Sequence, residues 1–142
     1  MKIRLLMLGK TRRAELRAVI DDYVERIGRA NAMEVEELRD GEAVLKKLNA
    51  NRAAATVLLD AGGKALDSEQ FAKWLAEQRD RGTRELIFIC GDADGFPDSL
   101  RGRVRQKISL SPMTYSHELA RAMLAEQLYR AFAILSGSPY PK

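Results

Sequence analysis

Cysteine and histidine are the scarcest reactive residues of this chain, with one of each among 142 residues. The single cysteine, Cys90, cannot form an internal disulfide, and its place in the apolar run Leu86–Cys90 fits a reducing compartment. One cysteine and one histidine also provide too few ligands for a structural zinc site. We therefore expect no disulfide and no bound metal.

Long apolar runs are absent as well. The longest ones, such as Leu86–Cys90, have the size of a strand and fall far short of the roughly 18 residues that a membrane span needs. The opening residues Met1–Leu5 show no apolar signal core followed by a small-residue cleavage site. We expect no membrane association and a cytoplasmic location.

Two common nucleotide-binding motifs are missing. No G-x-G-x-x-G follows the first predicted strand, so an ordinary Rossmann-type dinucleotide or methyltransferase site lacks its signature. Gly9-Lys10-Thr11 looks like the end of a phosphate-binding P-loop, but Arg4 stands where that motif requires its first glycine. These absences argue against nucleotide hydrolysis.

Apolar strand-like runs alternate along the chain with amphipathic helical stretches. In the helical stretch Arg12–Arg29, apolar residues recur at steps of three and four and form one face. The predicted strands are Lys2–Leu8, Met33–Leu38 at an edge, Thr56–Leu59, Glu85–Cys90 and Lys107–Leu110. The other predicted helices are Asp40–Asn49, one capped by Asp67 or Ser68, one beginning near Pro97, and one from about His117 to Leu135. This order predicts one α/β domain over residues 1–142, with a mostly parallel sheet and helices on both faces.

Three loops of unusual composition follow three of these strands. They are a predicted turn at Asp60–Lys64, the glycine-flanked Gly91–Gly95, and Ser111–Ser116. Ligands of parallel sheets bind outside the carboxyl ends of the strands, so the three loops together predict a site. A plainer interpretation of each loop is also open: the glycines can serve an ordinary turn, and Thr114 or Ser116 can merely cap the last helix.

Basic residues outnumber acidic ones and give a net charge of +4, which mildly favours a polyanionic partner such as RNA. Four cations without an acid lie close together at Arg101, Arg103, Arg105 and Lys107. This run leads into the Ser111–Ser116 loop and can bring RNA phosphates to the predicted site, although a solvated surface is an equally good interpretation. Glu126 and Arg130, four residues apart on the last predicted helix, have the spacing of a surface ion pair.

Several motifs carry a resemblance to a known family. They are Gly9-Lys10, Arg26-Ile27-Gly28, Leu59-Asp60-x-x-Gly63-Lys64, Gly91-x-x-x-Gly95, Leu110-Ser111-x-Met113-Thr114-x-x-His117-x-x-x-Arg121 and Glu126-Gln127-x-Tyr129-Arg130. With them, nearly the whole chain resembles the RlmH family of ribosomal RNA methyltransferases, which are knotted proteins of the SPOUT type. The resemblance implies a deep trefoil knot at the C-terminal end, and a homodimer whose site combines one subunit's knot with the partner's C-terminal tail.

The resemblance also implies a reaction. S-adenosylmethionine is the implied cofactor, and the implied substrate is a pseudouridine in helix 69 of 23S ribosomal RNA, methylated at N3, with ribosomal RNA or the ribosome as the partner. The implied cofactor-contacting residues are Leu59, Gly91, Leu110, Ser111, Pro112, Met113, Thr114 and Tyr115. The expected RNA contacts are Arg101, Arg103, Arg105, Lys107, Arg130 and Lys142.

Three residues are the candidates for catalysis. The reaction must align N3 with the methyl group and remove the N3 proton. If a histidine removes that proton it must be His117, the only one in the chain. Arg121 could stabilise the negative charge that develops on the base, and Tyr140 belongs to the tail that the family uses at its site.

The tail leaves other functions open. The family tail usually reads Tyr-His-Lys or Tyr-His-Arg, whereas this chain ends Tyr140-Pro141-Lys142. That difference, together with the basic run, favours a first alternative, a SPOUT enzyme with a different RNA target. A second alternative is a non-catalytic protein that binds RNA or the ribosome, and a generic flavodoxin-like module would require the motif match to be accidental.

Overall fold

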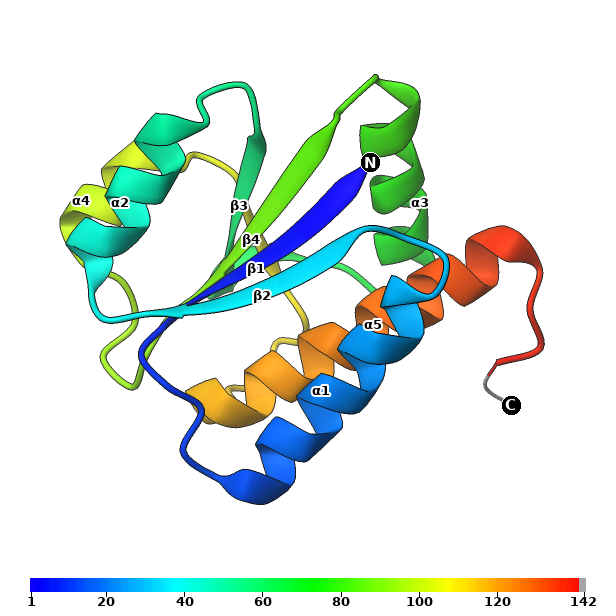
Figure 1. The fold of residues 1–142 in the computed structure, drawn as a ribbon, viewed down its shortest axis with the longest axis horizontal. Helices are drawn as coiled ribbons and strands as arrows, with labels where there is room; N and C mark the ends of the chain where they lie inside the picture. The colour runs from blue at the N-terminus through cyan, green and yellow to red at the C-terminus, as the bar shows by residue number, and fades with distance from the viewer. Residues whose placement is uncertain (141–142) are drawn as a thin grey trace.

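The structure, a computed structural model that describes residues 1–140, is built on a five-stranded sheet in the order β2-β1-β4-β3-β5 (Figure 1). The strands are β1 (Lys2–Leu8), β2 (Met33–Leu38), β3 (Ala55–Ala65), β4 (Glu85–Cys90) and β5 (Lys107–Ser109). The helices are α1 (Ala14–Gly28), α2 (Gly41–Ala50), α3 (Ser68–Asp80), α4 (Asp98–Arg103) and α5 (His117–Ser136). All four strand pairings are parallel, so the predicted α/β fold with a parallel sheet is confirmed.

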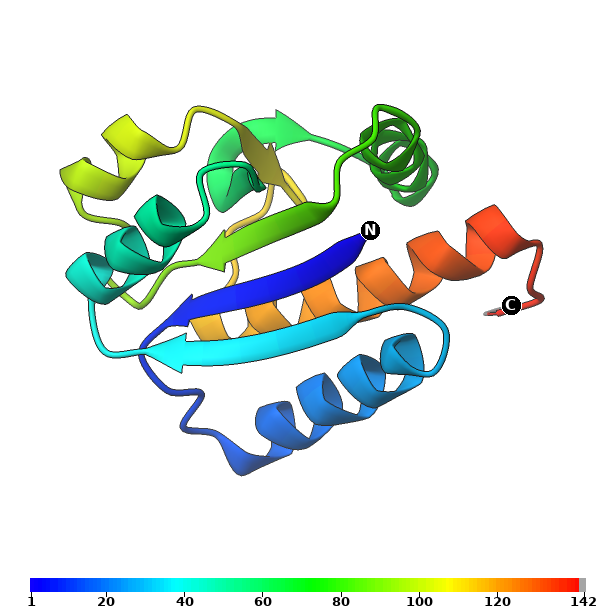
Figure 2. The ribbon, with the colours of Figure 1, turned by 45° about the horizontal axis from the view of Figure 1, so that its top comes forward.

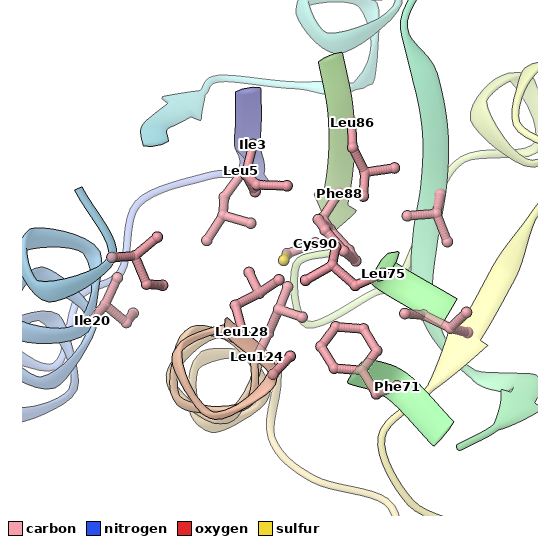
Figure 3. Close-up of a cluster of buried hydrophobic side chains, with 14 of the residues drawn as sticks. Ile3, Leu5, Ile20, Phe71, Leu75, Leu86, Phe88, Cys90, Leu124 and Leu128 are labelled. Atoms are coloured by element: carbon pink, nitrogen blue, oxygen red, sulfur yellow. The ribbon is translucent and has the colours of Figure 1, made fainter. Parts of the chain in front are cut away.

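Helices cover both faces of the sheet, because side chains alternate along each strand. Ile3, Leu5 and Met7 of β1 point toward the layer of α1, α3 and α5, in a core that includes Ile20, Phe71 and Leu124 (Figure 3). Leu6 and Leu8 point the other way, toward α2 and α4. Figure 2 shows the two helical layers on opposite sides of the strands.

Helix α5 positions the part of the chain that matters most for function. It packs between α1 and α3 and runs antiparallel to the strands, so it begins near their carboxyl ends (Figure 1). The Ser116 side chain caps it by accepting a hydrogen bond from the Leu119 amide, and Gly137 ends it in a left-handed conformation with φ +75°. His117, the first residue of α5, therefore lies at the carboxyl edge of the sheet.

Strand β3 departs from the expected pattern. The predicted turn at Asp60–Lys64 was wrong, because the strand continues to Ala65 after an irregularity between Leu59 and Lys64. Both Leu59 and Lys64 pair with Ile108 of β5, so the intervening residues bulge out of the ladder. Gly63 crosses β5 so closely that a Cβ atom there would lie 2.7 Å from the carbonyl carbon of Lys107.

The trefoil knot and the single domain over residues 1–142 stay predictions. The expectations for Pro141 and Lys142 fall outside the described residues. Within residues 1–140, no helix is long and apolar enough to cross a membrane. The same residues contain no group of three or more histidine, cysteine, aspartate or glutamate side chains placed to hold a metal ion.

Candidate functional site

A cavity of about 210 Å³ opens at the carboxyl ends of β3, β4 and β5. The three loops that the sequence singled out all contribute to its wall. The predicted residues that line it are Leu59, Gly91, Leu110, Ser111, Met113, Thr114, Tyr115, His117 and Arg101. The structure therefore brings together seven of the eight expected cofactor contacts, and Pro112 is the one that does not line the cavity.

The loop after β4 is drawn tightly together. Asp92 and Gly95 form an isolated antiparallel bridge, and Gly95 has φ +80°. A Cβ atom on Gly91 would lie 2.8 Å from the carbonyl oxygen of Gly95, so only glycine fits at this point of the loop. The absence of a side chain leaves the Gly91 backbone itself as the wall of the cavity.

The loop after β5 holds its shape through serine side chains. The Ser109 hydroxyl donates to the carbonyl of Ser111 at 2.7 Å, and the Ser111 hydroxyl accepts from the Met113 amide at 3.0 Å. Met113 is 71% exposed although its side chain is apolar, and it lies in the cavity wall. An apolar side chain held at the mouth of a cavity is suited to cover an apolar or aromatic ligand.

An ion pair joins two walls of the cavity. Arg101 of α4 donates to the carboxylate of Asp60 at 2.6 Å, and its guanidinium lies 5.6 Å from the centre of the Phe96 ring. Partial burial by itself would raise the pKa of Asp60, but hydrogen bonds from Arg101 and the Gly62 amide outweigh burial and hold this pKa below its ordinary value. The cavity thus contains a fixed negative and a fixed positive charge side by side.

His117 is the only imidazole at the cavity. Its side chain is 29% exposed, and its Nε2 lies 3.8 Å from the Glu118 carboxylate. A histidine in this position can accept or donate a proton within the cavity.

Arg121 lies behind the cavity and contributes nothing to its surface. Its side chain is fully buried, and its guanidinium donates to the carbonyls of Leu8, Gly9 and Gly91 and to the hydroxyl of Thr11. Burial lowers the pKa of Arg121. The geometry thus suits a residue that positions the loops after β1 and β4, rather than one that contacts a substrate.

Tyr140 lies away from His117 in the same chain. Its hydroxyl donates to Glu126 at 2.8 Å and lies 3.1 Å from the hydroxyl of Tyr23. Partial burial and these two hydrogen bonds raise the pKa of Tyr140. Glu126 is nine residues beyond His117, a separation of about 13 Å along a helix at 1.5 Å per residue. Within one chain, the candidate catalytic residues are therefore not brought together.

The expected RNA contacts are dispersed. Only Arg101 lines the cavity; Arg103 donates to the Asn49 side chain at 3.2 Å, and Arg105 is exposed. Lys107 is half-buried at the start of β5. Arg130 forms the predicted ion pair with Glu126 at 2.8 Å, and its guanidinium lies 5.6 Å from the centre of the Tyr140 ring. Lys142 lies outside the described residues.

Sequence reasoning missed two carboxylates of the site and one beside it. Asp60 and Asp92 line the cavity; Asp60 directly follows the apolar part of β3 and Asp92 lies two residues after the end of β4, positions that could have marked them. Glu118 accepts hydrogen bonds from the amides of Arg12 and Arg13, both at 2.9 Å. Its only sequence signal is an acid in the first turn of a helix.

The chain is similar to known methyltransferases over nearly its whole length. A family model described as "Predicted SPOUT methyltransferase" matches residues 1–141. A protein of Geotalea daltonii named ribosomal RNA large subunit methyltransferase H is 43% identical, with 99% of both chains covered. Proteins of the same name from Dinoroseobacter shibae and Koribacter versatilis are 41% and 39% identical, each over 99% of this chain and over 98% and 97% of their own lengths.

Solved structures agree in fold. A probable methylase family protein from Haemophilus influenzae superposes with a TM-score of 0.64 at 10% identity, over 99% of this chain and 70% of its own. The SpoU methyltransferase AviRb from Streptomyces viridochromogenes gives a TM-score of 0.57 at 13% identity, over 96% of this chain and 61% of its own. At these identities the likeness concerns the fold alone.

Proposed function

Because the chain belongs to the SPOUT methyltransferase family, we propose that it transfers the methyl group of S-adenosylmethionine to N3 of a pseudouridine in helix 69 of 23S ribosomal RNA. The supporting observation is the cavity, which gathers seven of the eight residues expected to contact the cofactor around the only histidine. The relatives named ribosomal RNA large subunit methyltransferase H match this chain from end to end and support ribosomal RNA as the substrate.

The cavity wall fits the cofactor in its chemistry. Leu59, Leu110 and Met113 offer apolar surface for the adenine ring and the methylene groups of the cofactor, and the Gly91 backbone allows close approach. Asp60 and Arg101 offer opposite charges for the ammonium and carboxylate of the amino-acid end. When bound, S-adenosylmethionine supplies an activated methyl group on a sulfonium, so the protein has to align the acceptor nitrogen and manage its proton.

His117 is the residue that we assign to the N3 proton. It lines the cavity and can accept a proton from the base as the methyl group is transferred. Arg121 then acts as a positioning residue: its hydrogen bonds to the carbonyls of Gly9 and Gly91 hold the loops around the cavity. This replaces the earlier expectation that Arg121 contacts the base.

Tyr140 reaches a cavity only in a homodimer, where the tail of one copy lies at the site of the other. Two observations support this arrangement. Tyr140 is held by its bond to Glu126, which lies nine residues along α5 from His117 of the same chain. Large apolar side chains are also exposed on α1 and α5, at Val19, Leu119 and Ile134, which suits a contact between copies through these helices. The trefoil knot, the single domain and a cytoplasmic location complete the proposal, on the strength of the family.

The catalytic part of the proposal is tested with His117→Ala and His117→Gln in a methyl-transfer assay on ribosomes that lack the helix 69 methyl group. We expect the rate constant for transfer to fall by roughly 10²- to 10⁴-fold, the usual contribution of a general base. Cofactor affinity, measured by titration calorimetry, should change little because the rest of the wall is intact. Unchanged turnover in both variants would remove His117 from the mechanism.

An RNA- or ribosome-binding protein without activity is the second candidate. The tail residue Pro141, in place of the histidine usual in the family, motivates it. Cofactor binding separates the two, because an enzyme requires it and a binding protein does not. Cofactor binding with methylation at another nucleotide would instead identify a SPOUT enzyme with a different RNA target.

A further inference from the structure

The loop Gly9–Arg13, which joins β1 to α1, is held from beneath by two charged side chains of α5. The Glu118 carboxylate accepts hydrogen bonds from the amides of Arg12 and Arg13, both at 2.9 Å. Arg121 donates to the carbonyl of Gly9 and to the hydroxyl of Thr11, both at 3.1 Å. From the other side, Glu37 of β2 accepts from the Thr11 amide at 2.6 Å. Almost every residue of this short loop is therefore fixed through its backbone or its hydroxyl.

This arrangement places charged groups in the protein interior. Glu118 is 8% exposed and Arg121 is fully buried. Burying an ionised side chain is unfavourable unless hydrogen bonds compensate for the lost water. Here the compensation comes from the loop itself, and the hydrogen bond from the Arg13 amide is the main reason that the pKa of Glu118 is lowered. These hydrogen bonds hold the loop in one conformation, although a loop that only connects a strand to a helix needs no such bonds.

The loop lies next to the cavity. Glu118 directly follows His117, and the guanidinium of Arg121 that holds Gly9 also donates to the carbonyl of Gly91 at 3.3 Å. Both His117 and Gly91 line the cavity. A single buried guanidinium thus joins the loop to the wall of the proposed site.

The side chains that the loop presents to solvent are cations. Lys10, Arg12 and Arg13 are all exposed. Arg13 pairs with Glu15 at 2.9 Å, whereas no carboxylate of residues 1–140 lies within salt-bridge distance of Lys10 or Arg12. The nearby acids have other partners, because Glu118 binds loop amides and Glu37 binds Thr11 and Arg17. Lys10 and Arg12 are therefore two available positive charges on a rigid support beside the cavity.

We propose that Lys10 and Arg12 form a phosphate-binding surface that holds the backbone of the substrate RNA beside the methyl-transfer cavity. The proposal rests on the proposed function for the identity of the RNA. Cations on a fixed loop suit phosphates, because backbone contacts set the position of a nucleic acid without reading its sequence. The loop also suits this role better than the run Arg101–Lys107, because Arg101 belongs to the wall of the cofactor cavity and Arg103 is bound to Asn49.

The test compares two double variants with the same loss of charge. Lys10→Ala/Arg12→Ala removes the proposed surface. Arg52→Ala/Arg84→Ala removes two other exposed cations that come shortly before β3 and β4, at the opposite edge of the sheet. Binding of a fluorescently labelled, pseudouridine-containing helix 69 stem-loop is followed by anisotropy over a range of salt concentrations.

Loss of two phosphate contacts should reduce the slope of log K against log salt by about 1.4, at roughly 0.7 per phosphate of a single strand. We expect affinity to fall by roughly tenfold in Lys10→Ala/Arg12→Ala and by less than about twofold in the control. Thermal unfolding and cofactor binding should be unchanged in both, because all four side chains are exposed. Equal slopes for wild type and Lys10→Ala/Arg12→Ala, or equal losses in both double variants, would overturn the proposal.

Methyl transfer to ribosomes, measured in parallel, separates this proposal from the proposed function. Both proposals are supported if the wild type transfers methyl groups and Lys10→Ala/Arg12→Ala raises KM for the ribosome while kcat stays nearly unchanged. A wild type that transfers none, while the salt slope still depends on Lys10 and Arg12, overturns the proposed function and leaves the RNA surface standing. Normal transfer with the same KM in both double variants overturns the surface alone.

Discussion

Gly63→Ala tests how closely β3 crosses β5. The added Cβ would lie 2.7 Å from the carbonyl carbon of Lys107 and 2.8 Å from the amide nitrogen of Ile108. Ordinary contact begins at 3.4 Å, so one of the two segments must move by about 0.7 Å, the difference between 3.4 and 2.7 Å. Both contacts are with backbone atoms, so no rotation of a side chain can relieve them.

Two quantities should respond to this change. Overpacking of this kind typically lowers the free energy of unfolding by about 1–3 kcal/mol, which urea unfolding measures. Strand β5 leads directly into the Leu110–Tyr115 loop, so a shift in β5 also displaces the wall of the cavity. Misplacement on the order of 1 Å can slow an enzymatic step by about 10²-fold, and we expect methyl transfer to fall by roughly 10- to 100-fold.

Gly102→Ala is the matched control. It introduces the same methyl group in α4, where a Cβ atom meets nothing within 4 Å. Alanine in a helix is roughly 0.5–1 kcal/mol more favourable than glycine, so this variant should be as stable as wild type or more stable. A Gly63→Ala protein with wild-type stability and activity would show that β3 and β5 do not approach each other this closely at Gly63.

Three further predictions test other parts of the structure. Burial raises the pKa of the Cys90 thiol to about 12, so at pH 8 we expect iodoacetamide to modify the folded protein at least roughly 100-fold more slowly than the urea-unfolded chain; equal rates would show that Cys90 is accessible. The lowered pKa of Glu118 means that its carboxylate stabilises the fold above the ordinary value of 4.5 and that this stabilisation is lost as the pH falls through the folded-state pKa. The difference in unfolding free energy between wild type and Glu118→Gln should therefore shrink from pH 7 to pH 3.5, and a constant difference would contradict the assignment. Tyr140→Phe removes the hydroxyl that contacts Glu126 and Tyr23, and urea unfolding should show a loss of about 1 kcal/mol. No loss would mean that the tail is not held there in solution.

The strands were the most predictable part of the fold. Lys2–Leu8, Met33–Leu38 and Glu85–Cys90 were predicted with the observed ends, because the local pattern of apolar residues, continuous in the first and last and alternating in the second, marks each strand. The continuation of β3 from Asp60 to Ala65 was not predictable in this way. Turn-forming residues stand at Asp60–Gly63, and only pairing with β5, more than forty residues later in the chain, restores the strand.

The location of the site followed from a general rule, whereas the roles of its side chains did not. Parallel strands bring their carboxyl ends to one edge, so the loops at Gly91 and Ser111 could be expected to meet. The orientation of Arg121 could not, because its acceptors at Leu8 and Gly91 lie on distant segments that no local pattern connects with it. Long-range hydrogen bonds of this kind decide whether a polar residue of a helix faces a ligand or holds the scaffold.

The proposed target is tested by mapping the methylated nucleotide. Purified protein is incubated with labelled S-adenosylmethionine and ribosomes lacking the helix 69 methyl group, and the modified nucleotide is located by mass spectrometry of nuclease fragments. We expect one methyl group per 23S ribosomal RNA, on N3 of the helix 69 pseudouridine. Binding of the cofactor without incorporation at that nucleotide would contradict the proposed target.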